Sequence, residues 1–203
     1  MELTSIIVAF LTGVAGPIGV LYVKNYLQSR KPNSDMVTEA AEVGSLISTK
    51  IDDLKEEYGA DRVWVAQFHN GGHFYPTGKS IAKFSIFYET VQAGVASIQS
   101  NFQNIPVNLF SKAINRLLEE EVIEIFDYKD EKIATYGLKY IAEESGCKST
   151  YMFAIRNFEG KFIGILSIDY TRRKMNLDQE KIFELSNHAT SMGGVLMQHL
   201  NKK

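Results

Sequence analysis

Residues 150–196, TYMFAIRNFEGKFIGILSIDYTRRKMNLDQEKIFELSNHATSMGGVL, decide the fold class of this 203-residue chain. Two runs rich in β-formers, at 149–156 and 161–170, are separated by the four residues Asn-Phe-Glu-Gly. This arrangement predicts a β-hairpin. A polar stretch then leads into a segment with helical periodicity, from about 178 to 199. The end of the chain is therefore expected to hold a hairpin followed by a long helix.

The residues before this hairpin alternate between helical and extended patterns. Helical spacing is found at 36–58, 104–121 and 132–145, and extended runs are found at 62–69, 81–91 and 122–126. In the second extended run, we expect Ala82, Phe84, Ile86 and Tyr88 to share one face. Together with the final hairpin and helix, this order predicts an α/β (α+β) fold with a central antiparallel sheet flanked by helices.

The helix predicted at 36–58 has an apolar stripe that fits two arrangements. Met36, Ala40, Val43, Ile47 and the apolar residues that follow recur every three or four positions and end before Gly59. The stripe is expected to cover the sheet, although a helix pair between two copies of the chain has the same pattern.

Composition excludes several classes of protein. The chain is 45% hydrophobic and 23% charged with a net charge of -2, which is typical of a globular protein. No basic block is longer than the three residues 172–174, so a nucleic-acid partner is not expected. The single cysteine, Cys147, cannot form an internal disulfide and is interpreted as a buried structural thiol.

The N-terminus has the pattern of a membrane anchor. Residues 3–23 contain no charge, and a helix of that length spans about 30 Å, the thickness of the hydrocarbon core. Lys24, Arg30 and Lys31 follow, so the positive-inside rule places the rest of the chain in the cytoplasm. We therefore predict a single-pass protein of the inner (cytoplasmic) membrane, with an anchor and basic flank at 1–31 and a soluble domain at 32–203. Small residues spaced four apart in the span favour self-association, although glycine is also common in membrane helices.

The soluble part resembles the GAF domains, a small-ligand sensor fold related to PAS. The resemblance covers roughly 35–200 and rests on the strand, glycine turn, GILSIDY strand and helix after NLDQE within 150–196. It implies a GAF/PAS-like sheet and a sensing role. The motifs that mark the nucleotide-binding, bilin-binding or sulfoxide-reducing members are absent, so it implies neither a particular ligand nor a cofactor.

A second resemblance is to the single-span holins of T-even phages. These also place one membrane helix before a globular α/β domain, and they share Tyr151-Met152, Gly164 and Tyr170-Thr171-Arg172. This resemblance implies a span that oligomerises to permeabilise the inner membrane under control of the soluble domain. It also implies a periplasmic domain, whereas the charge pattern predicts a cytoplasmic one.

The most unusual stretch is QFHNGGHFYPTGKS at 67–80, which is expected to form a long exposed loop. Its GKS lacks the Walker A spacing and leads into a predicted strand, and its two histidines lack a third ligand, so neither an NTPase nor a metal site is expected. Glu89 is an odd charge in an apolar strand that would point into a pocket or lie at an edge. The predicted ligand-binding residues are Phe68, His69, Asn70, Phe74, Lys79, Glu89 and Asn104.

These observations predict a non-enzymatic, membrane-anchored GAF-like module without a cofactor. It is expected to sense a small ligand or to act as an oligomeric platform for a protein partner. The residues of the soluble domain carry no catalytic pattern, so the span could itself perform the function. The alternative is therefore the phage-type holin.

Overall fold

A computed structural model describes residues 13, 16–29 and 35–200. The chain separates into two units with the boundary between Glu39 and Ala40. In the first unit, helix α2 covers Gly16–Ser29. Within the described ranges, no helix is both long enough and apolar enough to cross a bilayer. Most of the predicted span at 3–23 and the predicted boundary after residue 31 fall outside the described residues, so both stay predictions.

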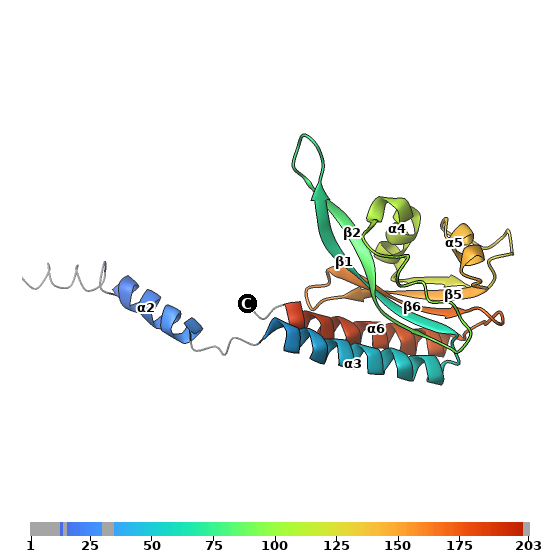
Figure 1. Ribbon diagram of the computed structural model, residues 1–203, viewed down its shortest axis with the longest axis horizontal. Coiled ribbons are helices and arrows are strands. Elements are labelled where there is room, and N and C mark those ends of the chain that lie inside the picture. Colours follow the sequence, from blue (N-terminus) through green and yellow to red (C-terminus); the bar gives the residue numbers. More distant parts are fainter. Residues whose placement is uncertain (1–12, 14–15, 30–34, 201–203) are drawn as a thin grey trace, which may run out of the picture. The chain divides into compact units, whose positions relative to one another are not determined.

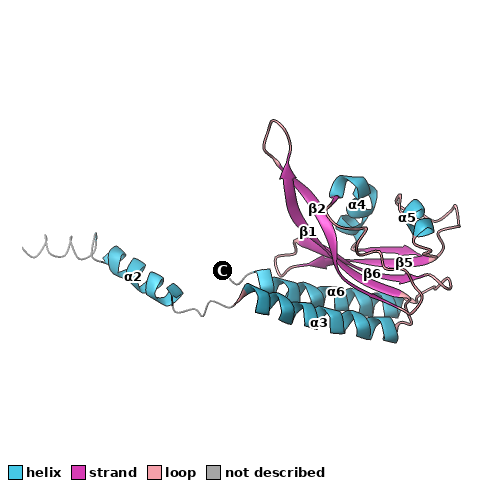
Figure 2. Cartoon of the chain, viewed as in Figure 1, coloured by secondary structure: helices cyan, strands magenta, loops and turns pink. Residues whose placement is uncertain are grey.

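The second unit is built on a six-stranded antiparallel sheet (Figures 1 and 2). Its strand order is β3-β2-β1-β6-β5-β4, so β6 from the final hairpin pairs with β1 as well as with β5. The strands are β1 Arg62–His73, β2 Ser80–Val91, β3 Ile105–Pro106, β4 Val122–Ile125, β5 Ser149–Arg156 and β6 Phe162–Tyr170. The central antiparallel sheet that the pattern predicts is confirmed.

Helices cover both faces of this sheet. Helices α3 (Met36–Glu57) and α6 (Gln179–Leu200) run together along one face (Figure 1). The other face carries the 3-10 helix η2 (Val107–Phe110), α4 (Ser111–Glu120) and the short α5 (Lys139–Glu144). Each face has its own hydrophobic cluster, so the sheet separates two cores.

Helix α3 forms for local reasons and is held by its apolar stripe. One carboxylate oxygen of Asp35 accepts the backbone N–H of Val37 at 3.1 Å, which caps the first turn. Ile47, Ile51 and Leu54 are fully buried in the cluster under the sheet. Of the two arrangements that fit the stripe, the structure has the one in which it covers the sheet.

A β-bulge in β2 corrects one expected face. Val65 pairs with Tyr88 and the next residue, Ala66, pairs with Ile86, so Phe87 is an extra residue in β2. Beyond this point, each side chain of β2 faces the side of the sheet opposite to the one that simple alternation predicts. Ile86 consequently lies in the cluster on the α4 side, whereas Tyr88 packs against the cluster on the α3 side. The expectation that residues 82, 84, 86 and 88 share one face is therefore wrong for Tyr88.

Two element lengths also differ from expectation. Strand β1 continues to His73, which leaves only 74–79 as the loop, because the ladder with β2 resumes after an irregularity between Asn70 and His73. The predicted helix at 132–145 is reduced to α5. Side chains of Asp127 and Asp130 accept nearby backbone N–H groups, and Gly137 has a φ of +84°, so the chain forms turns before α5 instead of a helix.

Candidate functional site

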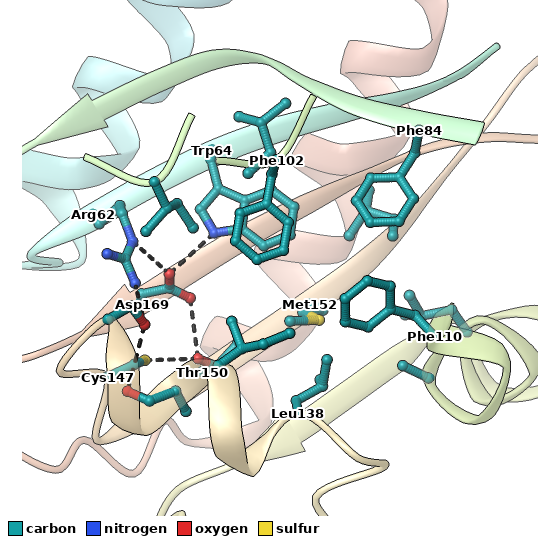
Figure 3. A pocket seen from close by; sticks show the side chains of 18 of the residues that line it. Arg62, Trp64, Phe84, Phe102, Phe110, Leu138, Cys147, Thr150, Met152 and Asp169 are labelled. Carbon is teal, nitrogen blue, oxygen red and sulfur yellow. Dashed lines mark hydrogen bonds and ion pairs between the residues drawn. The ribbon is translucent and has the colours of Figure 1, made fainter. Parts of the chain in front are cut away.

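An apolar cavity lies between the sheet and helices α4 and α5 (Figure 3). The volume in which the centre of a water-sized molecule fits is about 60 Å³. One water needs roughly 10–15 Å³ in the same measure. Most of its wall is aliphatic or aromatic. The apolar side chains that line it are Phe84, Ile86, Ile98, Phe102, Phe110, Ala113, Ile114, Leu117, Leu138, Ile141, Ala142, Met152 and Ile165.

Strand alternation places the polar side chains of the cavity. Arg62 and Trp64 on β1, Thr150 on β5 and Asp169 on β6 point to the cavity side. The residues between them, such as Val63, belong to the cluster on the α3 and α6 side. One face of three neighbouring strands therefore supplies the polar end of an otherwise apolar cavity.

The carboxylate of Asp169 is the centre of this polar end (Figure 3). In the strand register, Asp169 lies opposite Arg62 on β1 and opposite Thr150 on β5. Its Oδ2 accepts from Arg62 Nε at 2.8 Å and from Trp64 Nε1 at 3.0 Å. Its Oδ1 accepts from the hydroxyls of Thr150 and Ser167, each at 3.0 Å. Four donors thus satisfy one buried carboxylate.

Arg62 and Asp169 form a buried ion pair with exposed fractions of 1% and 3%. The guanidinium also donates to the carbonyl of Ala96 at 3.2 Å and to Ser145 Oγ at 3.4 Å. Burial lowers the pKa of Arg62, but the charge and hydrogen bond of Asp169 raise it by more, so the guanidinium stays protonated. Because the two charges cancel, this wall offers a ligand hydrogen bonds and little net charge.

The thiol of Cys147 lies at the edge of the same polar end. It is buried, as predicted, with Sγ 3.0 Å from Thr150 Oγ1 and donating to the carbonyl of Ser149 at 3.2 Å. Burial raises the pKa of this thiol to about 12, so it is protonated at neutral pH and is a poor nucleophile. Among the described residues, no three His, Cys, Asp or Glu side chains form a group that could hold a metal ion.

The structure brings His69 and Asn104 together, but neither lines the cavity. His69 Nε2 lies 2.9 Å from Ser85 Oγ, and the same hydroxyl accepts the backbone N–H of Asn104 at 2.8 Å. Phe68 packs edge to face with Phe162, with ring centroids 4.7 Å apart. These three predicted residues surround the middle of β2 and do not line the cavity.

The other predicted residues are more widely separated. Asn70, Phe74 and Lys79 are exposed on the outer part of the β1–β2 hairpin, where the Phe74 N–H donates to the Lys79 carbonyl at 2.8 Å. Glu89 accepts the backbone N–H of Ile98 at 2.9 Å, so it shapes the turn after β2. None of the seven predicted residues lines the cavity. Whether they bind a ligand stays a prediction.

The sequence reasoning missed Arg62 and Asp169, although a signal was present. Asp169 is a charge within the apolar GILSIDY strand, the same kind of anomaly that drew attention to Glu89. Its partner lies 107 residues away in the chain, so the pattern alone does not identify the pair.

Comparisons with known proteins find a shared fold. No known protein family matches the sequence, and no curated protein matches it. Among solved structures, the blue-light-absorbing GAF domain of Thermosynechococcus elongatus PixJ has a TM-score of 0.60 at 13% identity, covering 80% of this chain and 88% of that one. The far-red-absorbing dark state of JSC1_58120g3 with bound biliverdin IXa has a TM-score of 0.62 at 16% identity, covering 81% and 96%. The GAF domain region of a Geobacter sulfurreducens PCA protein has a TM-score of 0.59 at 13% identity, covering 81% and 99%. The GAF-like fold is therefore confirmed.

Proposed function

We propose that the domain is a non-enzymatic sensor that binds a compact, largely apolar small molecule in the cavity between the sheet and helices α4 and α5. The observation that carries this proposal is the cavity itself, with an apolar wall and one polar end centred on Asp169. Ligand sites combine apolar walls with a few placed polar groups in this way. Sensing is also the role expected of a GAF-like domain.

The size and chemistry of the cavity narrow the ligand. A volume of about 60 Å³ for water-sized centres is roughly four to six times what one water needs, which limits the part of the ligand inside the cavity to about one ring. The neighbour that contains biliverdin IXa holds an open-chain molecule of four rings, which exceeds this cavity. The ligand that we propose is therefore smaller and largely uncharged where it meets the Arg62–Asp169 pair.

The sheet offers a route from the cavity to the opposite helices. Asp169 faces the cavity, and the next residue, Tyr170, faces the other way and donates its hydroxyl to the carbonyl of Tyr58 at 2.9 Å. Tyr58 directly follows α3. A ligand that moves β6 at Asp169 would therefore shift the contact that holds the end of α3, which is how we propose the signal leaves the cavity.

The lack of enzymatic activity is part of the proposal. The one cysteine thiol at the cavity has a pKa raised to about 12 by burial, so it supplies little thiolate. The carboxylate of Asp169 already accepts four hydrogen bonds, which leaves it poorly placed to act as a general base.

Trp64 provides the test. It is the single tryptophan of the chain and lines the cavity, so its fluorescence reports occupancy. With the full chain in phosphatidylcholine vesicles, 2-phenylethanol should produce a saturable change. Ala113→Phe, which fills the cavity from α4, should abolish that change, while Asn115→Phe on the exposed side of α4 should keep it. Circular dichroism checks that both variants are folded. A response that does not saturate, or one that survives in folded Ala113→Phe, would refute the proposal.

Membrane anchoring is a further part of the proposal and is supported by the uncharged run at 3–23. A reporter fused to the C-terminus should show whether the domain lies in the cytoplasm, as the flanking basic residues predict. The holin alternative depends on the same run and stays a prediction. Its test is inducible expression in a bacterium with a membrane-potential dye, where abrupt depolarisation would favour the holin and steady growth would exclude it.

A further inference from the structure

The cavity adjoins a groove beside α5 whose charge indicates the class of ligand. This groove, which we name the α5 vestibule, has a volume of about 520 Å³. It shares five lining residues with the cavity, namely Ile98, Phe102, Phe110, Ile141 and Ser145. Because the two spaces have these walls in common, they are immediate neighbours.

A second groove meets the cavity on the other side of the turn after α5. This lysine groove is lined by Lys129, Lys148 and Lys174 and has a volume of about 500 Å³. Its walls shared with the cavity are buried, and they include the Cys147 thiol that is held by hydrogen bonds. The walls shared with the vestibule are mostly half-buried, as at Phe102. The border of the cavity with the vestibule is therefore more exposed than its border with the lysine groove.

The polar side chains of the vestibule carry little positive charge. All of its lining residues are described, and Glu144 is the one ionisable side chain among them. Ser97 and Asn101 add neutral polar groups. The nearest cation in the cavity, Arg62, is already neutralised by Asp169. A negatively charged group at this entrance would meet one carboxylate and no free cation.

We propose that the ligand is a small amphiphile whose apolar end fills the cavity and whose polar end, neutral or positively charged, lies in the α5 vestibule beside Glu144. This inference rests on the proposed function and adds the charge class and the orientation of the ligand. A ligand with an anionic end is disfavoured, because the vestibule lacks the cations that would compensate its charge.

Three probes with the same ring separate the charge classes. They are 2-phenylethanol, phenethylamine and phenylacetate, titrated against the full chain in phosphatidylcholine vesicles with Trp64 fluorescence as the readout. At neutral pH, phenethylamine is a cation and phenylacetate an anion. We expect the Kd of phenethylamine to be about five- to tenfold lower than that of phenylacetate, the ratio that one exposed carboxylate several ångströms away produces.

Two neighbouring glutamates of α5 provide a matched pair of variants. Glu144 lines the vestibule, whereas Glu143 lines the lysine groove, and both are exposed. Glu144→Lys should invert the preference towards phenylacetate. Glu143→Lys should keep the native preference.

The outcomes separate this inference from the function on which it rests. If 2-phenylethanol binds but phenylacetate binds the native chain as tightly as phenethylamine, the charge class is wrong and the sensor proposal stands. The same holds if both lysine variants change the preference equally. If none of the three probes saturates, the cavity is not a site for one-ring ligands and both proposals fail.

Discussion

Replacing Asp169 by asparagine should destabilise the domain far more than an ordinary polar substitution. The side chain keeps its shape, but Arg62, only 1% exposed, loses its counter-charge. Removing one partner of a buried ion pair costs about 3–5 kcal/mol. The amide avoids a conflict between donors only by turning its NH2 towards the hydroxyls of Thr150 and Ser167, which must then accept instead of donate. The melting temperature should therefore fall by about 6–20 °C, at roughly 2–4 °C per kcal/mol for a domain of this size.

Urea and thermal denaturation of the full chain, followed by circular dichroism, would measure this loss. Ser167→Ala is the matched control, because it removes one donor to Asp169 and leaves the ion pair intact. Its expected cost is about 1 kcal/mol. If Asp169→Asn costs less than about 1 kcal/mol, or no more than the control, the buried pair is not the structural centre of the cavity.

Two further predictions concern packing and pH. A Cβ at Gly193 would lie 2.0 Å from the backbone oxygen of Arg156, so Gly193→Ala should cost about 1–3 kcal/mol in urea denaturation. At Gly194 the nearest atom, 3.3 Å away, belongs to the exposed ring of Phe158, which can move, so Gly194→Ala should be neutral or stabilising by up to about 1 kcal/mol. Equal losses would contradict the close approach of α6 to β5. Burial raises the pKa of Cys147 to about 12 in the folded chain, whereas the unfolded thiol has a pKa near 8.5. The contribution of the protonated thiol to the free energy of unfolding is therefore complete below about pH 8.5 and is lost as pH rises towards 12. Between pH 9 and 11, the free energy of unfolding of Cys147→Ala should therefore fall less than that of the native chain. If the free energies of both proteins fall in parallel with pH, ionisation of Cys147 is not linked to unfolding.

Local pattern was enough for the elements whose boundaries depend on neighbouring residues. The final hairpin and α6 lie close to their predicted positions, since the Gly160 turn, the β-rich flanks and the helical spacing are all short-range signals. Pattern failed where an element depends on distant pairing. The β1 extension to His73 exists because β2 pairs with it, and the glycines there had indicated a loop. At Phe87, one extra residue inverted the faces of β2 in a way that alternation does not reveal.

The sequence by itself determined that an antiparallel sheet is flanked by helices, because hydrophobic periodicity distinguishes strands from helices without knowledge of their partners. It also contained the anomaly of a charge inside an apolar strand. Only the tertiary structure decided that Asp169 meets Arg62 and Thr150. That meeting requires β6 to lie between β1 and β5 in one register. The hairpin pairs Thr150 with Asp169, but Arg62 reaches Asp169 only because β1 pairs with β6 across 107 residues of the chain. The polar end of the cavity and its charge balance follow from that pairing, which is why the candidate site moved from the glycine-rich hairpin to the opposite end of the same strands.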